Sequence, residues 1–439
     1  MSTAHSKKAK VFLKNQTYTD WHDATFWGVR VGRDNMAMGL DEWEQLRQKA
    51  SEIKRHTLSH LDKYLEQFAD NAASHGVKVH WAADAAEFNS IVLEILRSHG
   101  ARKLVKSKSM LTEECGMNPC LEAHGIEVVE TDLGERIIQL KGQAPSHIVM
   151  PATHLSHHEV GELFEEKGIS DQTGNHDPTY LTYRARLSLR GEFLSADAGM
   201  TGANFGIAST GEIVVCTNEG NADMSTSIPK LQISAIGLEK IIPDYDSLAV
   251  FQRMLCRSGT GQPTTAYTSF FGKARCEGAE FHIVLVDNGR SQWLQNPAHW
   301  ETLKCIRCGS CMNTCPVYRR SGGYSYSYFI PGPIGINLGM LRSPAAHQGN
   351  LSACTLCKSC QFVCPVKIDL ADQIYAWRQE WPAAGKRFIS SAMSTVFNSE
   401  GIYNAATGAA HLANMVPASW LPFRLRFPRK PFHRIFKDL

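Results

Sequence analysis

Two cysteine runs with identical spacing, "CIRCGSCMNTCP" and "CTLCKSCQFVCP", constrain this chain more than any other feature of its sequence. Both follow the pattern C-x2-C-x2-C-x3-C-P. With 13 cysteines in 439 residues, one chance match is expected in roughly one chain in 10^5. Two matches in one chain therefore point to a shared chemical role. The runs consist of Cys305, Cys308, Cys311 and Cys315, and of Cys354, Cys357, Cys360 and Cys364.

Disulfides are the first alternative for such closely spaced thiols, and the rest of the sequence argues against them. The first 23 residues, "MSTAHSKKAKVFLKNQTYTDWHD", lack the apolar core of a signal peptide. A chain of this length also builds a hydrophobic core without covalent staples. We therefore expect a cytoplasmic protein, in which clustered thiolates act as metal ligands or catalytic groups.

The spacing indicates which metal group the thiolates hold. Zinc sites usually combine two ligand pairs across a longer loop, whereas this run is typical of bacterial ferredoxins with [4Fe–4S] clusters. In two-cluster ferredoxins the fourth cysteine of each run ligates the other cluster. We therefore predict two [4Fe–4S] clusters, with zinc or mixed sites as the alternative. The predicted ligands are Cys305, Cys308, Cys311 and Cys364 for cluster 1, and Cys354, Cys357, Cys360 and Cys315 for cluster 2.

The part of the chain before the cysteines alternates between strand and helix patterns. Apolar residues at three- and four-residue steps predict one helix from Asp41 to Gly76, with Asp41 and Glu44 as a capping pair. Runs such as "VKVHWA", "RKLVKS" and "IEVVETDL" then read as strands separated by helices. This alternation favours a parallel sheet covered by helices. We predict four segments: an N-terminal segment and helix (1–76), an α/β domain (77–293), a small α-helical ferredoxin-type two-cluster domain (294–382) and a C-terminal tail (383–439).

Polar residues follow several predicted strands, where parallel sheets bind ligands. At the turn "KSKS", Lys106, Ser107, Lys108 and Ser109 precede a predicted helix and are a candidate anion or substrate site. The alternative is a basic capped turn without a function. Further polar turns end other strands, and the sequence leaves open whether they converge on one cavity. They are "VETDL", "TNEGN", "SGTGQ" and "DNGR".

Several stretches carry a resemblance to a known family. "VKSKSMLTEE", "GIEVVETDLGERIIQL", "GANFGIASTG", "TNEGN", "GLEKIIP" and "VLVDNGR", followed by the two cysteine runs, resemble the lactate utilization protein B family. The resemblance covers nearly the whole chain in order. It implies that the α/β domain is a lactate-utilization (LUD) domain, related in fold to sugar-phosphate isomerases and CoA-transferases. One departure is Ser209, where the family often has glutamate.

The resemblance also implies a function. Members are iron–sulfur proteins of bacterial L-lactate oxidation, which work with lactate utilization proteins A and C. The chain would then be an electron-transfer subunit of an L-lactate dehydrogenase complex that passes electrons to an acceptor. No Gly-rich dinucleotide motif or P-loop occurs, so the oxidation of lactate itself would take place on a partner. The alternative is a LUD protein that binds a small acid and uses its clusters for structure or redox sensing.

Charge and hydropathy limit other partners. The formal net charge is +3, and no long basic run suggests nucleic-acid binding. Residues 401–423 carry no charged side chain except for a histidine, but they are rich in small polar residues and contain two prolines, so we expect no transmembrane span. The tail "RLRFPRKPFHRIFKDL" mixes basic residues with phenylalanine. It is typical of an arm that docks on a partner or a membrane surface, or of a solvated terminus.

Overall fold

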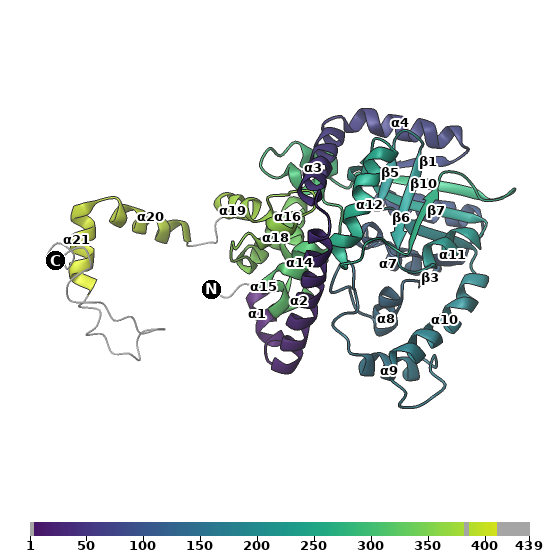
Figure 1. The fold of residues 1–439 in the computed structure, drawn as a ribbon, viewed down its shortest axis with the longest axis horizontal. Coiled ribbons are helices and arrows are strands. Elements are labelled where there is room, and N and C mark those ends of the chain that lie inside the picture. The colour runs from purple at the N-terminus through teal and green to yellow at the C-terminus, as the bar shows by residue number, and fades with distance from the viewer. Residues whose placement is uncertain (1–3, 382–385, 411–439) are drawn as a thin grey trace. The chain divides into compact units, whose positions relative to one another are not determined.

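A six-stranded parallel sheet forms the centre of the α/β part in the computed structural model, which describes residues 4–381 and 386–410 (Figure 1). Its strand order is β1-β10-β7-β4-β2-β3, and every neighbouring pair is parallel. The central strand β7 is buried along its whole length, as expected where helices cover both faces. The strands are β1 (Lys78–Ala82), β10 (Glu280–Val286), β7 (Leu231–Gly237), β4 (Ala198–Gly202), β2 (Lys103–Lys106) and β3 (Glu127–Glu130).

Helices cover both faces of this sheet. Helices α5 (Ala85–Ser98) and α7 (Met117–Ala123) pack on one face, where Leu104, Ile233 and Val284 belong to their core. The other face packs against α4 (Leu61–Ser74), α10 (Pro178–Leu194) and α11 (Asn221–Ser227). Helix α11 lies so close that a Cβ on Gly199 would come within 1.5 Å of the Ser225 carbonyl oxygen. Helices α8 (Leu133–Lys141) and α9 (His157–Glu166) form a smaller core with α10.

A second, four-stranded sheet extends from the carboxyl ends of the first. It has the order β8-β5-β6-β9. Only two residues separate β4 from β5, and a single 3-10 turn (Leu238–Lys240) separates β7 from β8. The two sheets therefore meet at the edge where parallel sheets bind ligands. The strands are β5 (Phe205–Ile207), β6 (Glu212–Thr217), β8 (Ile241–Ile242) and β9 (Tyr267–Phe271), and helix α12 (Tyr245–Gly259) follows β8.

The cysteine part is helical and packs with the N-terminus of the chain. Helix α2 (Gln16–Met38) contacts α14 and α15, and α1 (Ala4–Phe12) contacts the 3-10 turns beside them (Figure 1). The buried helix α16 lies between the two cysteine runs. The helices here are α14 (Ser310–Thr314), α15 (Pro316–Ser321), α16 (Gly332–Arg342), α17 (Pro344–His347), α18 (Ser359–Val363) and α19 (Leu370–Glu380).

Most of these elements belong to one compact unit, Met1–Trp377. A second unit begins at Arg378 and contains α20 (Lys386–Phe397) and α21 (Glu400–Ala410). None of the described helices is both long and apolar enough to cross a membrane. The tail that the sequence suggested as a docking arm, and most of the uncharged stretch before it, lie outside the described residues.

The predicted fold class is confirmed: a parallel α/β domain precedes a helical cysteine domain. The single helix predicted over 41–76 is wrong, because His60 separates α3 (Trp43–Ser59) from α4. The predicted Asp41–Glu44 cap is also wrong. Glu42 takes the N-cap position, without a side-chain hydrogen bond. Helices α2, α10 and α12 were not predicted, although Asn15, Asp177 and Asp244 cap them with their side chains.

Candidate functional site

The two cysteine runs adopt the same local conformation. In each run the residue directly before the second cysteine has a positive φ, of 60° at Arg307 and 58° at Leu356. Its backbone N–H donates to the first cysteine sulfur, over 3.3 Å to Cys305 and 3.4 Å to Cys354. Non-glycine residues in this region cost about 1–3 kcal/mol each, and such strain concentrates at functional sites. Both loops therefore have a backbone conformation that suits a loop curved around a bound group.

The structure brings the fourth cysteine of the second run to the first run. Cys364 lines one small apolar void together with Cys305, Cys308 and Cys311. Ile148, Ile306, Ile334 and Val366 complete its wall. Ile334 belongs to the linker helix α16, so the linker shields this group of thiols from water. We name these four cysteines the inner set.

The remaining four cysteines, which we name the outer set, are Cys315, Cys354, Cys357 and Cys360. Burial raises the thiol pKa of Cys315 to about 11, and the negative charges of Cys354 and Cys357 contribute in the same direction. Cys315 therefore lies near the second run. Cys357 is exposed and Cys354 half-buried, whereas three cysteines of the inner set are buried. The outer set is thus the one that lies closer to solvent.

The separation of the sulfurs discriminates between zinc and a larger cluster. A tetrahedral zinc site with Zn–S bonds of ~2.3 Å holds its sulfurs about 3.8 Å apart. Within residues 4–381 and 386–410, the group of three or more metal-binding side chains whose ligand atoms lie within 4.8 Å of one another is His99, Glu280 and His282. No three cysteine sulfurs of these residues form such a group, so their spacing in this structure is wider than one zinc ion requires.

Arginines from the N-terminal helices hold the two cysteine helices together. Nη1 of Arg30 donates to the hydroxyl oxygens of Thr314 in α14 and Ser359 in α18. Arg33 donates to the Val363 carbonyl over 3.1 Å, and Arg47 to the Cys364 carbonyl over 3.0 Å. Sequence reasoning missed these residues, because neither their spacing nor their neighbours distinguishes them from surface arginines.

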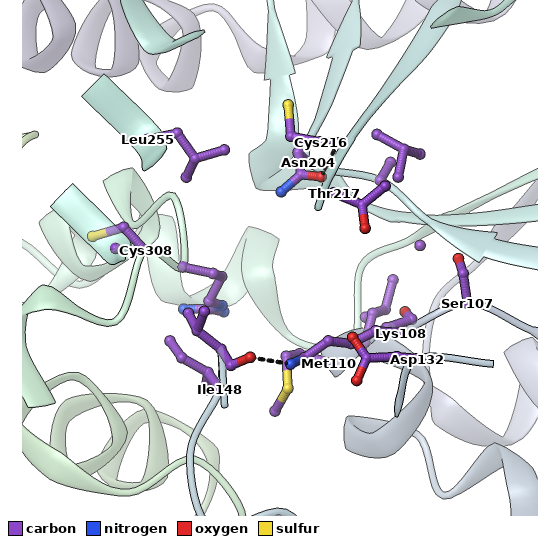
Figure 2. A pocket seen from close by; sticks show the side chains of 18 of the residues that line it. Ser107, Lys108, Met110, Asp132, Ile148, Asn204, Cys216, Thr217, Leu255 and Cys308 are labelled. Carbon is purple, nitrogen blue, oxygen red and sulfur yellow. Dashed lines mark hydrogen bonds between the residues drawn. The ribbon is translucent and has the colours of Figure 1, made fainter. Parts of the chain in front are cut away.

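A cavity of about 370 Å³ lies where the two sheets meet and reaches the first cysteine run (Figure 2). Three of the predicted strand-end turns converge here, since Asp132, Asn218, Glu219 and Arg290 line it. Thr260 also lines it, but the prediction that "SGTGQ" ends a strand is wrong, because Thr260 directly follows helix α12. Cys308 of the inner set lines its other side. Residues that the sequence did not single out contribute as well: Glu114, Asn204, Glu239, Lys240 and Arg307. Ser209, where the resemblance departs from the family, lies in a turn that is not part of the lining.

The wall next to Cys308 is rich in buried charge. Arg290 binds Glu114 through two nitrogens, over 3.0 and 2.9 Å, and also donates to Glu239. Nη2 of Arg307 lies 3.5 Å from the other oxygen of Glu239. Although burial opposes its charge, the neighbouring cations lower the carboxyl pKa of Glu239 to about 2. Burial and the Arg307 charge lower the ammonium pKa of Lys240 to about 8. We name this region, with Lys240, the cationic end of the cavity.

The opposite end of the cavity is acidic. Figure 2 shows Asp132, Lys108 and Ser107 there, away from Cys308. Glu219 accepts a hydrogen bond from the Leu133 backbone N–H over 3.2 Å. Burial and the Asp132 charge raise its carboxyl pKa to about 7. The cavity can therefore bind a molecule that has different charges or polar groups at its two ends.

The structure separates the four residues of the "KSKS" turn. Lys106 is buried away from the cavity and forms ion pairs with Glu130 (2.7 Å) and Glu113 (3.3 Å). Burial opposes its charge, but these carboxylates outweigh it and raise its pKa. Ser107, Lys108 and Ser109 do line the cavity. Of these, Lys108 donates to the Val149 carbonyl over 2.7 Å and Ser109 caps helix α6 (Met110–Glu114).

Comparisons with known proteins agree with this architecture. Residues 65–289 match the LUD domain family, and residues 301–368 match the 4Fe-4S dicluster domain. The "Lactate utilization protein B" of Macrococcus caseolyticus is 45% identical over 77% of this chain and 72% of its own length. The chain belongs to the lactate utilization protein B family.

Two further relatives match this chain with similar identity and coverage. The "Lactate utilization protein B" of an Exiguobacterium species is 44% identical over 80% of this chain and 75% of its own length. The "Uncharacterized electron transport protein YkgF" of Escherichia coli is 41% identical over 80% and 74%. Both family domains fall on the two structural parts described above, so the cysteine part of this family member is a 4Fe-4S dicluster domain.

The two lysines of the turn differ in what their removal would cost. Lys106→Met leaves Glu130 buried without its cation, so we expect a loss of about 3–5 kcal/mol in the free energy of unfolding. Lys108→Met removes a hydrogen bond to the Val149 carbonyl oxygen and a long ion pair of 3.9 Å with Glu135. Because burial raises the carboxyl pKa of Glu135 to about 8, this carboxyl can stay neutral without Lys108, so we expect a loss of about 1 kcal/mol. Urea denaturation of both variants measures the difference. Equal losses would contradict the separate roles that the contacts assign.

Proposed function

We propose that this chain is the cytoplasmic electron-transfer iron–sulfur subunit of an L-lactate-oxidising complex. The observation that carries the proposal is the arrangement of its cysteines. One set of four is buried beside the cavity, and the other lies close to solvent. Two redox groups at different depths give electrons a route between the surface and the interior. The names of the relatives support lactate utilization as the process that this route serves, and we propose L-lactate oxidation as its chemistry.

Under this proposal the chain holds two [4Fe–4S] clusters with crossed ligands. Cys305, Cys308, Cys311 and Cys364 would hold cluster 1, and Cys354, Cys357, Cys360 and Cys315 would hold cluster 2. The wall that Cys364 shares with the first run supports the crossing, and the wide spacing of the sulfurs supports clusters over zinc. Bound clusters supply one-electron redox steps, so a pair of them can divide the two electrons of lactate oxidation.

The protein's own groups favour negative charge at these sites. Backbone N–H groups of Arg307, Leu356 and Ile368 donate to the sulfurs of Cys305, Cys354 and Cys364. Lys240 donates to the Cys305 carbonyl over 3.4 Å, and the ammonium group of Lys54 lies buried nearby on the Glu239 carbonyl. Hydrogen bonds to sulfur and nearby positive charge are both means by which a protein raises a cluster's potential. The inner set has buried lysines around it, and their positive charge would make cluster 1 easier to reduce.

The partners are proposed from the family. Lactate utilization proteins A and C would complete the complex, and one of them would remove the electrons from lactate. An external acceptor or donor would meet the chain at cluster 2, because Cys357 is the exposed ligand. Phe362, in the same cysteine run, is an exposed apolar side chain at 69% and would contribute to such a contact.

Crossed ligation makes a specific prediction for Cys315. In the sequence it belongs to the first run, but its removal should damage cluster 2. We expect Cys315→Ala to lose iron at the site of Cys354, Cys357 and Cys360. Electron paramagnetic resonance of the reduced protein would measure this, with Cys308→Ala and Cys357→Ala as matched controls for the two clusters. A Cys315→Ala spectrum that matches Cys308→Ala rather than Cys357→Ala would show that each run is self-contained.

The isolated chain tests whether lactate oxidation requires the partner proteins. Because it has no recognisable nicotinamide or flavin motif, the cluster-loaded protein alone should not reduce an artificial dye when L-lactate is added. Adding lactate utilization proteins A and C should start dye reduction. Turnover by the isolated chain at the rate of the assembled proteins would place lactate oxidation in this subunit and overturn the proposal.

A further inference from the structure

We infer that the cavity between the two sheets binds an organic acid, with the carboxylate at the cationic end and an apolar body along the wall. This goes beyond electron transfer, which by itself requires no ligand in this chain. The site would lie directly against Cys308 of the inner set. The inference stands on unpaired donors, on a surplus of positive charge and on the size and lining of the cavity.

Arg307 supplies the first unpaired donor. The positive φ of its loop places it between the cysteines and the sheet, where it lines the cavity. Glu239 is shared between Arg290 and Arg307, and Arg290 also donates to both oxygens of Glu114 and to the Asp287 carbonyl. Nη1 of Arg307 is buried and has no hydrogen-bond partner. A buried charged donor without an acceptor is costly, and a carboxylate oxygen in the cavity would satisfy it.

Lys240 supplies a second donor at the cationic end of the cavity. It is 8% exposed, lines the cavity, and its ammonium group makes a single long contact of 3.4 Å with the Cys305 carbonyl. Three cations (Arg290, Arg307, Lys240) face two carboxylates (Glu114, Glu239) in this wall, which leaves one surplus positive charge. An anion within the cavity would supply acceptors to the donors that face it.

The remaining lining indicates an organic molecule rather than an inorganic ion. Met110, Ile148, Leu255 and Ile330 give the wall an apolar surface. Ser107, which is 3% exposed, has a hydroxyl without a partner. Asn204 accepts from the Cys216 N–H over 2.8 Å, and its amide nitrogen faces the cavity (Figure 2). A volume of about 370 Å³ lies in the range of ligand sites, roughly 300–1,000 Å³.

Calorimetric titration of the cluster-loaded protein without oxygen tests the inference. Phenylpyruvate serves as the probe, because it joins a carboxylate to an apolar ring. Pyruvate has the acid group without the ring, and 1-phenylpropan-2-one has the ring without the acid group. We expect phenylpyruvate to bind at least about tenfold more tightly than either. Equal affinity of the neutral ketone, or no binding of phenylpyruvate at millimolar concentration, would overturn the inference.

Two variants locate the site. Lys240→Gln should weaken phenylpyruvate about tenfold and leave the ketone unchanged. Ala203→Leu adds bulk to the lining and should abolish binding of both. Lys49→Gln, an exposed lysine of helix α3 outside the cavity lining, is the matched control and should bind as the original protein does. Iron content is measured for each. Full-strength binding by Ala203→Leu with normal iron content would place the probe elsewhere and overturn the inference.

The same variants separate this inference from the proposed electron transfer. Loss of binding in Ala203→Leu with normal partner-driven reduction of the clusters would support the cavity as a separate ligand site. Normal binding of phenylpyruvate in a protein whose clusters never become reduced would support the site and contradict the electron-transfer proposal.

Discussion

The packing of helix α14 against helix α18 is the interaction on which the rest of this molecule depends. Each helix carries the third cysteine of one run, Cys311 in α14 and Cys360 in α18, so their contact sets the distance between the two groups of thiols. It also brings Cys364 to the first run. The hydrogen bonds of Arg30 to Thr314 and Ser359 stabilise this contact, because they join α14 to α18. The N-terminal helix α2 is therefore part of the cysteine domain, although the α/β domain separates the two in sequence.

A buried network of charges joins the cysteine domain to the α/β domain. Glu239 at the carboxyl end of β7 contacts Arg307 in the first cysteine loop, and Arg290 links Glu239 to Glu114. Burying such ions is expensive, and well-packed apolar residues often serve stability as well or better. Their presence between a cavity and a redox group therefore has a functional explanation: they fix the loop and provide positive charge next to both.

Local patterns in the sequence predicted the parts of this structure that local physics determines. Cysteine spacing located the two ligand loops, and short apolar runs located β1, β2 and β3. Long-range contacts decided the rest. Lys106 and Lys108 look alike in sequence, but β2 ends at Lys106. The Lys106 side chain therefore pairs with Glu130 beside helix α6, whereas Lys108 lies in the cavity wall. Arg307 lies between two predicted ligands, and only the three-dimensional loop shows that it faces Glu239.

The central claim is that the clusters exchange electrons with a lactate-fed partner rather than hold the fold together. The most direct measurement is the visible absorbance of the cluster-loaded chain, mixed without oxygen with lactate utilization proteins A and C. Adding L-lactate should bleach the absorbance of both clusters, and an added oxidant should restore it through repeated cycles. Unchanged absorbance, while the partners oxidise lactate and reduce a dye directly, would show that the clusters in this chain are structural.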